Sequence, residues 1–149
     1  MKLELKCDFH KLVTAFEGAP NKVRSLVRLQ LQKAGRDIID YAREHHNYKT
    51  RTGKLEREGL VMDMPDDFTA VISTNKSVPY AVMVHEGTEP HVIEPRNKLA
   101  LRWAKGGEFV FAKRVFHPGT KPDQFLYNAA EEMWPRIQGD FENALDNLL

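Results

Sequence analysis

Two stretches of this chain repeat apolar residues at three- and four-residue spacing, the pattern of an amphipathic helix. The first stretch begins at the turn-like segment 18–21 and is predicted to end near His46. Its apolar face is formed by Val23, Val27, Leu31, Ala34, Ile38 and Tyr41. The second stretch follows Thr120, which approximates a capping box with Asp123. Its stripe is formed by Leu126, Ala130, Met133, Trp134, Ile137, Phe141, Leu145 and Leu148. Pro135 interrupts that stripe without changing its phase, so we expect a kinked helix or two abutting helices.

Short apolar runs separated by Gly, Pro and Asp turns predict β-strands elsewhere in the chain. The predicted strands span residues 2–7, 60–64, 68–74, 81–85, 91–94, 99–104 and 108–116. The run at 81–85 also fits one turn of helix, and Gly106-Gly107 suits the tight turn of a hairpin. There are no repeats and no low-complexity linker. The pattern therefore predicts one α+β domain over residues 1–149, with an antiparallel sheet packed against a long N-terminal helix and a kinked C-terminal helix.

Composition narrows the class of protein only slightly. The 149 residues carry a formal net charge of +1. No apolar run approaches the roughly 20 residues that span a bilayer, and the first residues lack the apolar core of a signal peptide. Cys7 is the only cysteine, which excludes an internal disulfide. We therefore expect a protein of the cytoplasm with no membrane partner.

Charge is distributed unevenly along the second half of the chain. The segment Arg96–Lys121 has seven Lys or Arg residues and one acid, whereas Pro122–Leu149 has six acids and one base. These charges either keep solvent-facing surfaces hydrated or join copies head to tail in a ring. On the first helix, three apolar residues lie off the main face. They belong either to a wide core stripe or to a second contact surface. The resulting subunit-interface candidates are Leu26, Leu29, Ile39, Arg102, Lys113, Arg114, Glu131 and Glu142.

The segment after the first helix is rich in basic residues. Its four bases, which we call the basic loop, are Lys49, Arg51, Lys54 and Arg57. Such a cluster is either a solvated connection or a phosphate-binding surface. If copies form a ring, the basic loop is a candidate to contact DNA in the lumen.

Histidine is the residue type most open to a catalytic interpretation. His85, Glu86 and His91 lack the spacing of a zinc-protease helix, so no metal ligands are assigned. His85 and His117 would suit an acid–base pair only if the fold brought them together in a pocket. The alternative is that residues His117, Pro118, Gly119 and Thr120 form a structural turn, with Pro and Gly at its inner positions. No phosphate-binding glycine loop and no serine nucleophile elbow is present. We expect no catalytic residue, no metal and no cofactor.

An ordered series of short motifs carries the strongest functional signal. It comprises Thr52-Gly53-x-Leu55, Tyr80-Ala81, Glu86-Gly87-Thr88, His91-Val92-Ile93-x-Pro95, Ala100-Leu101, Val110-Phe111-Ala112, His117-Pro118-Gly119-Thr120-Lys121-Pro122 and Phe125-Leu126. In this order the series resembles the minor tail or tail-completion proteins of tailed bacteriophages. The chain departs from that pattern at Glu56, where a serine is expected nearby, and at Gln124, where the family often has proline.

The resemblance implies a structural protein of virion assembly and not an enzyme. It implies a tail-terminator, tail-completion or neck component that forms a homo-oligomeric ring, commonly a hexamer, at the head–tail junction. The implied partners are further copies of itself, other neck and tail-tube proteins, and DNA passing through the lumen. The implied location is the tail or neck of the virion, after assembly in the host cytoplasm. Two alternatives stay open: a ribonuclease-like enzyme using His85 and His117, and a DNA-binding module acting through the basic loop.

Overall fold

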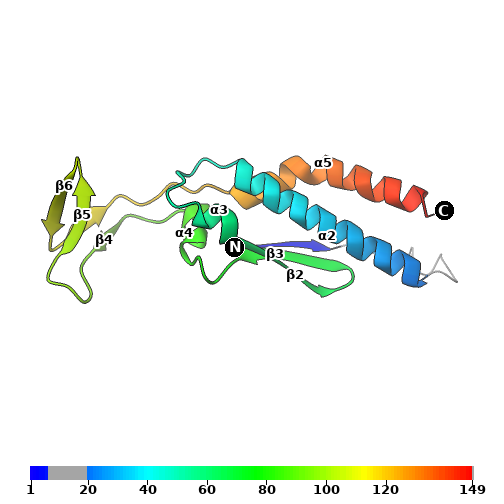
Figure 1. Ribbon diagram of the computed structural model, residues 1–149, viewed down its shortest axis with the longest axis horizontal. Helices are drawn as coiled ribbons and strands as arrows, with labels where there is room; N and C mark the ends of the chain where they lie inside the picture. The colour runs from blue at the N-terminus through cyan, green and yellow to red at the C-terminus, as the bar shows by residue number, and fades with distance from the viewer. Residues whose placement is uncertain (7–19, 149) are drawn as a thin grey trace.

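The protein has an α+β fold with an elongated shape (Figure 1). The structure is a computed structural model that describes residues 1–6 and 20–148. The helices of this part of the chain are α2 (Pro20–Glu44), α3 (Lys54–Glu58), α4 (Tyr80–Glu86) and α5 (Phe125–Asp146). The strands are β1 (Lys2–Lys6), β2 (Leu60–Asp66), β3 (Thr69–Thr74), β4 (His91–Ile93), β5 (Leu101–Lys105), β6 (Glu108–Ala112) and β7 (Val115–His117).

The body of the molecule is an antiparallel three-stranded sheet with two long helices. The strand order is β1-β3-β2, so the N-terminal strand pairs with β3 and not with its sequence neighbour β2. Helix α2 lies over the sheet, and α5 runs antiparallel to α2 along its length (Figure 1). The predicted N-terminal strand is confirmed through Lys6, whereas Cys7 lies outside the described residues.

The predicted face of α2 forms much of the core. Val23, Val27, Leu31, Ala34 and Ile38 are all buried. The buried stripe is wider than the sequence pattern indicated, because α2 contacts α3 as well as the sheet and α5.

Ile39 lies on the widened part of this stripe and belongs to the same core cluster as Leu55 of α3. It is only 7% exposed, so its assignment as an interface candidate is wrong. Leu26 is half-buried, and Leu29 is 60% exposed.

Helix α5 is continuous through Pro135, which rules out two separate helices. Phe125, Leu126, Ala129, Met133 and Ile137 form its buried face. Trp134, which the apolar pattern placed in the core stripe, is instead 50% exposed. The capping-box interpretation is also wrong: the residue before the helix is Gln124, and no side chain caps its first turn.

Strands β4 to β7 form an arm that projects from the body (Figure 1). The arm consists of two antiparallel pairs, β4 with β7 and β5 with β6. The predicted hairpin around Gly106 and Gly107 is confirmed, but its second strand stops at Ala112, and the following strand β7 pairs with β4. The run at 81–85 forms helix α4, so its strand interpretation is wrong and its helical alternative is confirmed.

Two glycines fix the junction between arm and body. Thr88 and Thr120 form a β-bridge, with their backbone amides donating to each other's carbonyls at 2.9 and 3.0 Å. Gly87 and Gly119 flank this bridge with φ values of 75° and 90°, a region that disfavours other residues. A Cβ at Gly119 would lie 2.3 Å from the carbonyl oxygen of Thr88. The outgoing and returning chains are therefore held in close contact.

Candidate functional site

The hairpin of β5 and β6 presents an exposed aromatic face. Antiparallel pairing sets Arg102 opposite Phe111 and Ala104 opposite Phe109, and directly paired residues lie on the same side of a hairpin. Phe109 and Phe111 are 61% and 65% exposed. The Arg102 guanidinium lies 4.6 Å from the centre of the Phe109 ring, a cation–π distance. We call Arg102, Ala104, Phe109 and Phe111 the aromatic face.

Other exposed apolar side chains lie elsewhere on the arm. Half of the large hydrophobic residues that are exposed in the described part of the chain fall between residues 92 and 116. They are Val92, Leu99, Trp103, Phe109, Phe111 and Phe116. Exposed apolar surface on this scale is typical of a protein–protein contact.

The charges of the arm and of α5 are opposite in sign. Arg102, Lys113 and Arg114 are exposed on the arm, and Arg114 lies 3.7 Å from the Glu94 carboxylate across its strands. On α5, Glu131 and Glu142 are exposed and form no ion pair with any described residue. The segments of opposite charge therefore lie on different elements, without neutralising one another within the described chain.

The basic loop lies beside an open pocket of about 950 Å³ between residues 47–56, α4 and residues 120–123. Lys49, Arg51 and Arg57 are exposed, and Lys54 is half-buried. The pocket therefore brings Lys49, Arg51 and Lys54 together with Lys121 at the base of the arm, whereas Arg57 lies on α3 and does not line it.

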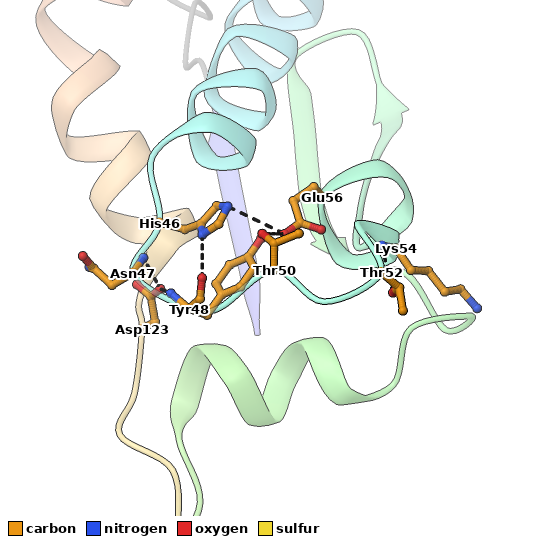
Figure 2. A network of polar contacts seen from close by, with 8 residues as sticks. All are labelled: His46, Asn47, Tyr48, Thr50, Thr52, Lys54, Glu56 and Asp123. Atoms are coloured by element: carbon orange, nitrogen blue, oxygen red, sulfur yellow. Dashed lines mark hydrogen bonds and ion pairs between the residues drawn. The ribbon is translucent and has the colours of Figure 1, made fainter. Parts of the chain in front are cut away.

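A network of polar contacts holds the start of this loop in place (Figure 2). The buried Asp123 carboxylate accepts hydrogen bonds from the backbone amides of Asn47 and Tyr48 at 2.6 and 2.7 Å, through a single oxygen. The ring of His46 stacks on Tyr48 with centroids 3.7 Å apart. These contacts tie the loop to the chain that returns from the arm, so Asp123 anchors the loop and does not cap α5.

Two further groups stabilise the centre of the loop. The Thr50 hydroxyl donates to Glu56, whose carboxylate lies 3.7 Å from Nε2 of His46. Burial alone would raise the pKa of Glu56, but the hydrogen bond from Thr50 and the nearby His46 lower it below its ordinary value. Burial raises the pKa of the Tyr48 phenol, and the Glu56 and Asp123 carboxylates raise it further. Glu56 therefore stays ionised and offsets part of the positive charge around it.

The two histidines of the enzymatic alternative have different surroundings. His85 is fully buried on α4, where its Nδ1 donates to Glu86 at 2.9 Å and its ring packs edge-on against Phe125 and Tyr127. Burial lowers the pKa of His85 more than Glu86 raises it. His117 lies on β7 in the arm and stacks on His91, with centroids 5.0 Å apart. This geometry lends the acid–base pair no support.

Residues 117–120 run from β7 to the bridge between Thr88 and Thr120 without forming a tight turn, so the turn predicted for them is wrong. The Gly119 amide donates to Nδ1 of His117 at 3.1 Å, and the Thr120 amide donates to the Thr88 hydroxyl at 3.0 Å. Within residues 1–6 and 20–148, no three His, Cys, Asp or Glu residues are grouped so that they could hold a metal ion. No helix in this part of the chain is both long and apolar enough to cross a membrane.

Phe109, Phe111 and Trp134 are not among the interface candidates predicted from the sequence, although they are 61%, 65% and 50% exposed. Alternation within residues 108–112 was the available signal, since it places Phe109 and Phe111 on one side of a strand. Comparison with protein-family models, curated proteins and solved structures finds no match to this chain. The functional assignment therefore rests on the ordered sequence motifs and on the geometry of these surfaces.

Proposed function

We propose that this protein is a structural component of a tailed-bacteriophage virion, a tail-completion, tail-terminator or neck protein that forms a ring at the head–tail junction. The observation that carries the proposal is the arm, which projects from the body (Figure 1) and bears exposed aromatic residues. An isolated monomer gains nothing from exposing them, whereas a subunit that contacts neighbours buries them on assembly. The ordered motifs from Tyr80 to Phe125 supply the link to phage tails.

The location of the motifs agrees with such a role. Glu86-Gly87-Thr88 and His117-Pro118-Gly119-Thr120 lie together at the junction, where the bridge between Thr88 and Thr120, flanked by Gly87 and Gly119, joins the two segments that connect arm and body. Motifs that are far apart in the sequence thus meet at the base of the arm. Assembly demands a fixed geometry, because small errors in the angle between subunits prevent a ring from closing.

The experiment is a knockout of the gene in the phage or prophage that encodes the chain, with complementation from a plasmid. We expect lysates without the protein to contain heads and tails that fail to join, or tails with unfinished ends, as seen by negative-stain electron microscopy. Complementation restores joined particles, which contain the protein by mass spectrometry. Mature infectious virions that lack the protein would reject the proposal.

The basic loop supports a second, subordinate role as a contact to DNA in the ring lumen. The observation in its favour is that the network around Asp123 and Glu56 anchors the segment that carries Lys49 and Arg51 beside an open pocket, with Lys54 and Arg57 on the adjoining helix α3. Bases gathered on one surface can together neutralise several phosphates of a nucleic acid. Exchange of all four bases for Ser should reduce DNA retention in assembled particles, and unchanged retention and infectivity would reject this role.

A further inference from the structure

We infer that the aromatic face of one copy docks on the exposed stripe of α5 in a second copy, and that this contact links subunits head to tail. The stripe consists of Glu131, Trp134, Gln138 and Glu142, which the helical period of 3.6 residues sets on one side of α5. All four side chains are exposed. The inference rests on the proposed function, because it names the contact that would join neighbours in the ring.

The two surfaces match in their apolar content. Phe109 and Phe111 are both more than 60% exposed. Together they leave roughly 250 Å² of aromatic surface in water, judged from the typical area of such side chains. Trp134 offers a half-exposed indole ring, and it also lines a groove of about 400 Å³ next to Leu5, Leu31 and Ile137. Aromatic side chains meeting in such a place are the usual centre of a protein interface.

The two surfaces also match in charge. Arg102 belongs to the aromatic face, and the arm around it carries seven bases against one acid between Arg96 and Lys121. Glu131 and Glu142 flank Trp134 on either side along α5 and have no ion-pair partner among the described residues. Lys6 on the rim of the groove is paired with Glu4 at 3.0 Å, so its charge is offset. This complementarity within a single sequence selects a second copy as the occupant.

The geometry makes the contact intermolecular. The arm projects from one end of the body, whereas α5 runs away from it toward the other end (Figure 1). The bridge between Thr88 and Thr120 joins the outgoing and returning segments at the base of the arm. A patch and its complement at separate places on one molecule form a heterologous contact, which either closes into a ring or continues as a filament.

The test is sedimentation velocity of the full chain and of two sets of variants, followed up to near-millimolar concentration. The arm variant is Phe109→Ser with Phe111→Ser, and the stripe variant is Trp134→Ser with Glu142→Lys. Each should weaken self-association by at least about 30-fold, the loss expected for interface hot spots. Phe116→Ser is the matched control: that side chain is 68% exposed on β7 but lies outside the aromatic face, so association should be unchanged. Circular dichroism and thermal melting verify that each variant is folded.

Mixing the two variants provides the sharpest result. The arm variant keeps an intact stripe and the stripe variant keeps an intact arm, so an equal mixture should form a one-to-one dimer that grows no further. Three results would each overturn the inference. The wild-type protein could stay monomeric throughout, the folded variants could associate like the wild type, or the mixture could contain no dimers. If the protein instead forms an isologous dimer, or if residues 7–19 of the same chain occupy the groove, the arm variant and the stripe variant will not restore association when they are mixed.

The result separates this inference from the proposed function. Complementing dimers formed by a protein that is absent from virions would uphold the docking contact and reject the role in the phage. Normal particles built from the Phe109→Ser, Phe111→Ser variant would uphold the role in the phage and reject the docking contact.

Discussion

Truncation of the Asp123 side chain should lower the free energy of unfolding more than any other single change in the loop network. In Asp123→Ala, the backbone amides of Asn47 and Tyr48 lose the oxygen that accepts from both of them at 2.6 and 2.7 Å. Hydrogen bonds to a charged group each contribute about 1.5–3 kcal/mol. Water from the adjacent pocket can replace part of this, so we expect a loss of about 3 kcal/mol in the free energy of unfolding.

The matched control is Asp123→Asn, which keeps an oxygen in nearly the same place but removes the charge. Its expected cost is about 1 kcal/mol, near that of a neutral hydrogen bond. For a chain of this size, 1 kcal/mol corresponds to roughly 2–4 °C in the melting temperature. Thermal melting should therefore place the alanine variant about 6–12 °C below the wild type, with asparagine between them.

Urea unfolding gives the free energies, and hydrogen exchange locates the effect. The amides of Asn47 and Tyr48 should exchange faster in the alanine variant even under native conditions. An alanine variant within about 0.5 kcal/mol of the wild type, the size of an ordinary surface substitution, would refute the reasoning. It would show that the buried carboxylate does not hold the basic loop.

Three other changes test separate parts of the account. Gly119→Ala should lower the free energy of unfolding by at least about 1 kcal/mol, because its φ is 90° and the added Cβ meets the Thr88 carbonyl. Gly139 lies within α5, where an added Cβ meets no other atom, so Gly139→Ala should raise the free energy of unfolding by about 0.5–1 kcal/mol in the same urea titration. Burial lowers the pKa of His85 in the folded state, so as pH falls below 6.5 the histidine gains a proton in the unfolded state first. The free energy of unfolding should therefore decrease by up to about 1.4 kcal/mol per pH unit until the folded-state pKa is reached. His85→Gln should flatten this slope. Exchange of the four basic-loop residues for Ser should weaken salt-sensitive DNA binding by assembled rings while leaving ring formation intact.

Each of these expectations has an outcome that contradicts it. Equal stability of the two glycine variants would mean that the junction tolerates a Cβ. An unchanged pH slope in His85→Gln would assign the acid sensitivity to other groups. DNA binding that persists without the four bases would show that the basic loop is not the surface that contacts DNA in the lumen.

Much of the body could be predicted from the sequence. The 3.6-residue period fixed the extent of α2 and α5 to within a few residues, because both helices bury one continuous face. The hairpin at Gly106-Gly107 followed from local turn chemistry, with φ values of 63° and 88° at these two positions.

Features that depend on distant contacts could not be predicted in the same way. The apolar run at 81–85 is short enough for either a strand or a helix, and only its packing decides for α4. Asp123 lies 76 residues from Asn47 in sequence, so nothing local distinguishes an anchor of the loop from a helix cap. Trp134 shares the period of the core stripe, but α5 buries too narrow a face to cover it.

A cryo-electron microscopy reconstruction of phage particles made by cells that carry this gene would test the proposed role and the docking contact together. We predict a ring of identical copies at the head–tail junction, in which Phe109 and Phe111 of each copy contact Trp134 of the next. A reconstruction without this chain, or one in which the arms reach no neighbouring copy, would contradict it.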